Sequence, residues 1–149
     1  MDKLRVDSGV KKIEVNDDGE CIEFSLTSSD FFRAFLDISQ WFDEQKNRQD
    51  IKEMEQQEDA VLEDKGSINY GTVNTILDIR EKISKEACEK IDNIFGPESS
   101  RKIFGGIIPD LFMIADFFEQ IAPLIEKYAK ERNQTINKKY SKNRRGAKS

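Results

Sequence analysis

The sequence predicts a mainly α protein (α+β), with an N-terminal β-hairpin packed on a bundle of three or four helices and a basic, flexible C-terminal tail. Three observations lead to this prediction: period-two alternation of apolar residues near the start, 3–4 spacing in the later segments, and loss of apolar residues after Ala129. A chain of 149 residues has the size of one domain. We place this domain at residues 1–129, with the hairpin at 10–26, the helical bundle at 27–129 and the tail at 130–149.

The hairpin is predicted from two short runs in which apolar and polar residues alternate, the pattern of strands with one buried face. Residues 16–19, Asn-Asp-Asp-Gly, separate the runs and supply a turn, because Gly19 can adopt a positive φ. An isolated hairpin is marginal in water, so its apolar face needs a helix to cover it or another chain to pair with. The apolar positions are Ile13, Val15, Ile22, Phe24 and Leu26.

The first helix is predicted to follow Thr27, which can cap it, with Asp30 in the first turn where a carboxylate favours the positive helix end. Its apolar residues follow the 3–4 spacing of one helical face, and we interpret this aromatic stripe as core. Residues 43–65 are highly charged and carry a thin apolar seam at Ile51, Met54, Val61 and Leu62. This pattern favours a solvated helix, and a helix that pairs with a partner is the alternative. The stripe consists of Phe31, Ala34, Phe35, Ile38, Trp41 and Phe42.

Glycine and proline divide the second half of the sequence. Residues 65–71 contain two glycines and are predicted to be a loop. An amphipathic helix is expected from about Thr72 to Phe95, where Gly96 allows a left-handed cap and Pro97 forbids continuation.

A short helix is predicted over residues 97–104, closed by two glycines, before the most apolar helix begins at Pro109. Asp110 lies near the start of this last helix. Pro123 lies inside it and is expected to kink or divide it. We expect the tail to be helical at its start and disordered at its end.

The sequence contains no histidine, so it lacks the most common general base and metal ligand. Cys21 and Cys88 form no motif, and we expect two reduced, packed thiols. The paired carboxylates have no calcium-loop spacing, and the Gly105-Gly106 pair lacks the rest of a phosphate loop. We therefore predict no catalytic, cofactor-binding or metal-binding residues, and a binding protein rather than an enzyme.

The net charge of -5 is unevenly distributed. Residues 130–149 contain eight Lys and Arg residues against one Glu, a net charge of +7, which leaves -12 on residues 1–129. The tail could contact nucleic-acid phosphates, with Tyr140 stacking on a base, but it suits an acidic protein surface equally well and the acidic body would repel nucleic acid. The basic candidates are Lys138, Lys139, Lys142, Arg144 and Arg145.

The two helices richest in aromatic residues supply the candidate partner-binding side chains. They are Phe31, Phe35, Trp41, Phe42, Phe112, Phe117 and Phe118. No stretch approaches the roughly 18 apolar residues of a membrane span, and no apolar run follows Met1 to act as a signal peptide, so we expect no membrane association.

Several phrases resemble a family of small proteins from phages and prophages of Gram-positive bacteria. Residues 4–11, Leu-Arg-Val-Asp-Ser-Gly-Val-Lys, with Val15-Asn16 after them, resemble the family's Arg-Phe-Asp-Thr-Gly-Val-Lys opening. Residues 24–32 resemble its Phe-Asn-Pro-Thr-Asp phrase before a Phe-rich helix, and residues 91–96 with 103–105 resemble its Ile-Asp-x-x-Phe-Gly and Leu-Phe-Gly element. The chain lacks the usual Pro near position 26, and its middle is longer and more acidic.

That resemblance implies a tail assembly chaperone, which coats the tape measure protein while tail tube subunits polymerise around it. It implies phage tail proteins as partners and the host cytoplasm as the location, and it assigns no residue roles. Two alternatives stay open: a nucleic-acid-associated or regulatory phage protein that uses the basic tail, and a structural component of the virion. Self-association also stays open, through the hairpin edges or through attraction between the acidic body and the basic tail of two copies.

Overall fold

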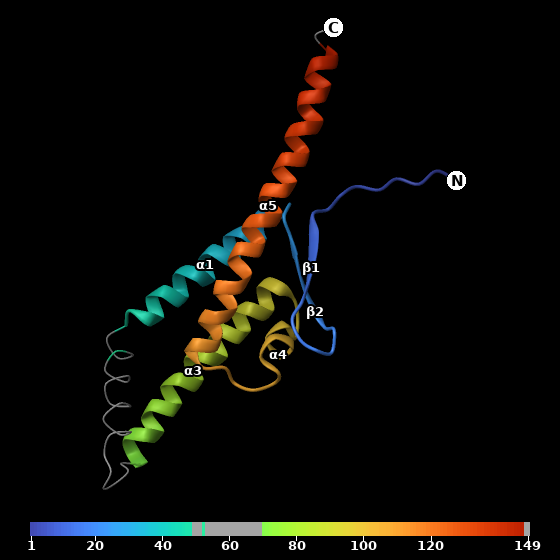
Figure 1. Cartoon of the computed structure of the whole chain (residues 1–149). Helices are drawn as coiled ribbons and strands as arrows, with labels where there is room; N and C mark the ends of the chain where they lie inside the picture. The colour runs from blue at the N-terminus through green and yellow to red at the C-terminus, as the bar shows by residue number, and fades with distance from the viewer. Residues whose placement is uncertain (49–51, 53–69, 148–149) are drawn as a thin grey trace.

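The computed structural model of the chain describes residues 1–48, Lys52 and 70–147, with side chains as far as Ser141 (Figure 1). The predicted hairpin and the mainly helical architecture are both confirmed. Most of the charged segment at residues 43–65, with its apolar seam, lies outside the described residues. The elements are β1 (Val10–Glu14), β2 (Cys21–Ser25), α1 (Ser29–Lys46), α3 (Tyr70–Phe95), α4 (Ser99–Phe104) and α5 (Leu111–Ala147).

The hairpin places one apolar face against the helices. Its strands are antiparallel, and Ile13 lies opposite Ile22 while Lys11 lies opposite Phe24. Ile22 and Phe24 are almost fully buried, and β2 is the strand that packs against α3 and α4. The apolar residues that alternate in the sequence therefore lie on the face of the hairpin that packs against the helices.

Helix α3 is the centre of the bundle, because it packs against α1, α4, α5 and β2. Phe95, at its end, lies in contact with rings from three other elements. The ring centroids of Phe24, Phe31 and Phe117 lie 6.3, 5.8 and 5.7 Å from that of Phe95. Such offset and edge-to-face pairs add to the stability that burial of the rings provides.

Two helix starts differ from the predictions. Ser28, not Thr27, caps α1, because the Ser28 hydroxyl oxygen accepts a hydrogen bond from the Phe31 amide at 3.1 Å. The Thr27 hydroxyl is engaged elsewhere, since it donates to the carbonyl of Ser8 at 2.8 Å. Helix α3 begins at Tyr70, so Gly71 belongs to the helix and not to the predicted loop.

The short helix and the turn after it follow the prediction. Gly105 and Gly106 both adopt positive φ, at 75° and 80°, which ends α4. The Asp110 carboxylate then accepts a hydrogen bond from the Met113 amide at 2.8 Å, which satisfies one of the free donors at the start of α5.

Helix α5 is longer than predicted. It continues through Pro123, which is exposed, so the helix is not divided at this residue. It also continues to Ala147, so the tail is helical over more of its length than the predicted start, and residues 148–149 lie outside the described residues. The tail is rich in good helix formers, and its basic side chains favour the negative helix end.

The C-terminal part of α5 extends beyond the rest of the molecule (Figure 1). An ion pair ties this part to the N-terminal segment, because the Arg132 guanidinium donates to the Asp7 carboxylate at 3.2 Å. Within residues 1–48 and 70–147, no helix combines the length and the apolar composition that a membrane span requires.

Candidate interaction surface

A groove lies between the end of β1, helix α4 and the first half of α5. We call it the α4–α5 groove. Its cavity volume is about 350 Å³. The carboxylates of Glu14 and Asp116 and the amide of Gln120 lie among otherwise apolar lining residues. The apolar lining consists of Ile13, Val15, Ile103, Phe104, Met113, Phe117, Ile121 and Leu124.

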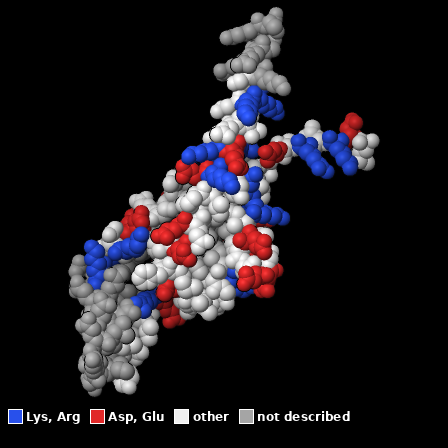
Figure 2. Space-filling view, viewed as in Figure 1, with Lys and Arg blue, Asp and Glu red and all other residues white. Residues whose placement is uncertain are grey.

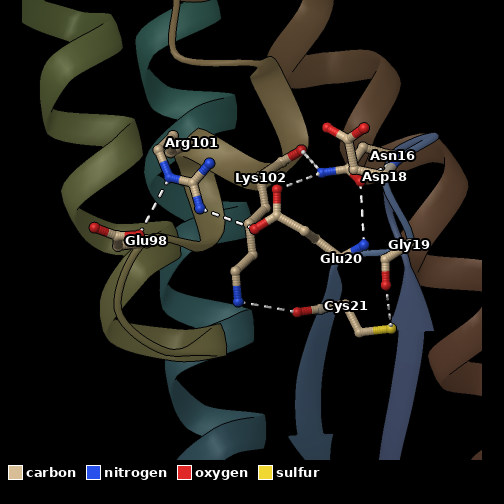
Figure 3. Close-up of polar contacts among 8 residues, drawn as sticks. All are labelled: Asn16, Asp18, Gly19, Glu20, Cys21, Glu98, Arg101 and Lys102. Atoms are coloured by element: carbon tan, nitrogen blue, oxygen red, sulfur yellow. Dashed lines mark hydrogen bonds and ion pairs between the residues drawn. The ribbon is translucent and has the colours of Figure 1, made fainter.

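A network of polar contacts holds the hairpin turn against α4 and so fixes two walls of this groove (Figure 3). The side-chain amide of Asn16 donates to Glu20 at 3.1 Å and to the Lys102 carbonyl at 3.2 Å. The Asn16 carbonyl oxygen accepts from the amides of Asp18 and Glu20, which shapes the turn. Lys102 in turn donates to the Cys21 carbonyl at 3.3 Å.

Arg101 completes the network from the exposed side. Its guanidinium donates to Glu20 at 2.9 Å and to Glu98 at 3.2 Å. The hydrogen bonds from Arg101 and then from Asn16 lower the pKa of Glu20 below the ordinary carboxyl value. The same contact with Glu20 raises the pKa of Arg101, so both groups keep their charges in the folded state.

Three exposed apolar side chains lie in and just after the loop between α4 and α5. We call Ile107, Ile108 and Phe112 the apolar loop. Their exposed fractions are 60%, 52% and 85%, which are high for residues of this kind. Phe112 follows Leu111, which packs on Ile76 and Ile83 of α3, so the loop is anchored to the body.

The surface around the apolar loop carries only negative charge from its own segment. Residues 103–126 contain Asp110, Asp116, Glu119 and Glu126 and no Lys or Arg. Figure 2 shows an uncharged area in this part of the molecule, bordered by carboxylates and, next to the hairpin turn, by Lys or Arg side chains. This face is therefore an apolar surface with carboxylates around it, and Arg101 and Lys102 of α4 lie at its border with the hairpin turn.

The structure separates the seven aromatic candidates into three groups. Phe31, Phe42 and Phe117 are buried in the core, so they cannot contact a partner while the fold is intact. Phe35, Trp41 and Phe118 are half-buried and pack against that core. Phe112 alone of the seven is exposed.

The basic candidates lie on the projecting part of α5. Lys138 and Lys139 are exposed, and Tyr140 between them and Ser141 is 62% exposed. Lys142, Arg144 and Arg145 are within the helix, but their side chains lie outside the described residues.

Sequence reasoning missed Ile107, Ile108, Glu14 and Asp116. The signal for the first two was present, because two isoleucines between a Gly-Gly break and Pro109 have no helical face to pack on. No sequence signal was available for Glu14 and Asp116, since they are brought to one groove from positions far apart by the packing of β1 beside α5.

The cysteines are free thiols, and both are half-buried. Burial raises the pKa of the Cys88 thiol, which lowers its reactivity at neutral pH. In the part of the chain that the structure describes, no group of three or more Cys, Asp or Glu residues is placed to hold a metal ion.

The fold and this surface define a small α+β protein, with a hairpin packed on a helical bundle and an exposed apolar face. A family model described as "Family of unknown function (DUF6673)" matches residues 18–149, and the chain belongs to that family. No curated protein and no solved structure matches the chain.

Proposed function

We propose that this protein is a non-enzymatic tail assembly chaperone that binds the tape measure protein in the host cytoplasm while a phage tail is built. The observation that carries the proposal is the apolar loop beside the α4–α5 groove. Ile107, Ile108 and Phe112 are exposed there without cover from the chain itself. The resemblance of residues 4–11 and 24–32 to small phage tail-region proteins is the reason for proposing the tape measure protein as the bound partner, or client.

The chemistry of the surface suits a long helical client. An amphipathic helix can place its apolar face in a groove, with anchor residues at every third or fourth position. Met113 and Leu124 offer apolar contacts along one side of the groove, and Phe112 extends the contact surface toward the loop. The acidic rim and the charged remainder of the body would keep a complex with an apolar client soluble.

Co-expression with the tape measure protein of the same phage tests this proposal. We expect the wild-type chain to bring the tape measure protein into the soluble fraction, and a variant with Ile108→Ser and Phe112→Ser to lose most of this effect. Leu36→Ser is the matched control, because Leu36 is 66% exposed but lies on α1, away from the groove. A tape measure protein that stays insoluble beside the wild-type chain, or equal rescue by the double variant, contradicts the proposal.

The position of the gene is a second, independent test. A chaperone of this kind should be encoded between the gene for a major tail protein and a gene for a very long, helical protein. Its consistent occurrence away from tail genes would count against the assignment.

A nucleic-acid-associated role is the second candidate. It is favoured by the exposed Lys138, Lys139 and Tyr140 on a helix that projects away from the acidic body. Clustered cations release counterions from phosphates, so the binding should weaken steeply with salt and disappear when residues 138–149 are deleted. Absence of binding to DNA and RNA by the intact chain at low salt would exclude this role.

A further inference from the structure

Helix α5 carries opposite charges on its two halves. Residues 103–126, which include its first half, hold four carboxylates and no cation. Residues 127–141 hold five Lys and Arg residues and one Glu. Because α5 is one continuous helix, these charges are fixed at opposite ends of the molecule and cannot neutralise each other within one chain.

The face of α5 that packs into the core continues beyond the body. Ile121 and Ile125 are buried on this face, and Arg132, Ile136 and Tyr140 continue it at intervals of about four residues. Val6 and Asp7 of the N-terminal segment lie beside part of this stripe. Cover is incomplete, because Tyr140 remains 62% exposed.

The α4–α5 groove offers the complementary surface at the other end of α5. Its carboxylates, Glu14 and Asp116, are exposed, and its apolar lining leaves a cavity of about 350 Å³. A chain cannot fill its own groove with its own tail. Asp116 and Tyr140 are 24 positions apart on one helix, which separates them by roughly 36 Å at about 1.5 Å per residue.

We propose that the groove takes the C-terminal part of α5 from a second copy of this chain. Ile136 and Tyr140 of the second copy would contact the apolar lining. Lys139, which lies beside this face of the helix, would approach Glu14 and Asp116 across the rim, whereas Lys138 lies on the opposite side of the helix. The two surfaces that meet are different, so the contact is heterologous. The same groove is the proposed client site, so the second copy would compete with a client there, but this contact is tested on the pure protein.

Charge reversal with rescue tests the contact. The groove variant carries Glu14→Lys and Asp116→Lys, and the tail variant carries Lys139→Glu. All three side chains are exposed, so we expect both variants to fold, which circular dichroism would check. Sedimentation equilibrium at low salt should show association of the wild-type chain and at least a tenfold weaker association of each variant alone.

An equal mixture of the two variants should associate again, because each tail then meets a groove of opposite charge. Added salt should weaken the wild-type contact, since exposed charges are screened within about 10 Å at 0.1 M ionic strength. The control carries Glu86→Lys and Glu89→Lys on α3, outside the groove, and should associate like the wild-type chain. A monomeric wild-type chain at low salt, undiminished association of either variant, or failure of the mixture to associate would each overturn the proposal.

Discussion

Arg101 on α4 donates a hydrogen bond to Glu20 in the hairpin turn at 2.9 Å, and so joins two side chains that are 81 positions apart in the sequence. Asn16 lies on the other side of Glu20 and donates to it at 3.1 Å. The hairpin is therefore attached to the bundle at its turn as well as through its apolar face. This contact leads to the first prediction.

Substitution of Arg101→Gln should raise the pKa of Glu20 toward the ordinary carboxyl value, because the largest cause of its lowering is removed. A lowered carboxyl pKa stabilises the folded state above the unfolded-state pKa, and this contribution is lost as the pH falls through the folded-state value. Unfolding midpoints of the wild-type chain should therefore fall more steeply than those of Arg101→Gln between about pH 5 and pH 2. Carbon-detected NMR titration of Glu20 measures the shift directly, and identical titration curves would contradict this reading.

Asp7 is predicted to hold the N-terminal segment in place. Its carboxylate accepts from the Gly9 amide at 2.9 Å and from Arg132 at 3.2 Å, and the Gly9 contact is the larger cause of its lowered pKa. Asp7→Ala removes both contacts, whereas Asp7→Asn keeps an oxygen for the Gly9 amide. Hydrogen exchange at Gly9 should thus be fastest in Asp7→Ala and intermediate in Asp7→Asn. Unchanged exchange in Asp7→Ala would show that the segment is held by other contacts.

Gly9→Ala should destabilise the fold more than Gly105→Ala. Both glycines have positive φ, 69° and 75°, so a side chain at either site costs about 1–2 kcal/mol in backbone strain. At Gly9 a Cβ would also lie 2.9 Å from the Thr27 methyl carbon, while nothing lies within 4 Å at Gly105. Urea unfolding of the two variants checks the order, and equal losses would mean that the Thr27 side chain moves aside freely.

Phe95→Ala and Phe112→Ala form a matched pair. Phe95 is 5% exposed and touches three other rings, so its truncation should cost about 3–5 kcal/mol. Phe112 is 85% exposed, and its truncation should stay within about 0.5 kcal/mol of the wild-type stability. Thermal or urea unfolding separates the two cases. A large loss for Phe112→Ala would mean that this ring supports the fold instead of facing a partner.

The sequence pattern predicted the strands and helix ends well, because these features are determined by residues that are close together in the sequence. The alternation at Ile22 and Phe24 and the glycines after Phe104 act within a few residues, and the structure has the strand and the helix end at those positions. Thr27 shows where such reasoning fails. The Thr27 hydroxyl donates to the Ser8 carbonyl, and Ser28 caps the helix in its place. The Ser8 contact joins residues 19 positions apart, so a local sequence pattern does not predict it.

The candidate surface could be predicted only in part. Phe31 and Phe112 look alike in sequence, since each begins an aromatic-rich helix. Their exposure differs because Phe31 is covered by Phe24 and Phe95 from other elements, whereas the loop before Phe112 turns that ring outward. Tertiary packing decides which apolar side chains face water, and the carboxylates beside them are gathered in the same way.

Helix α5 runs without a break from Leu111 to Ala147, and its length is roughly 55 Å at about 1.5 Å per residue. We expect a group attached near its far end to move with the body. A fluorophore placed at Tyr140 would accordingly tumble with the whole molecule, and its anisotropy would report on the rigidity of the rod.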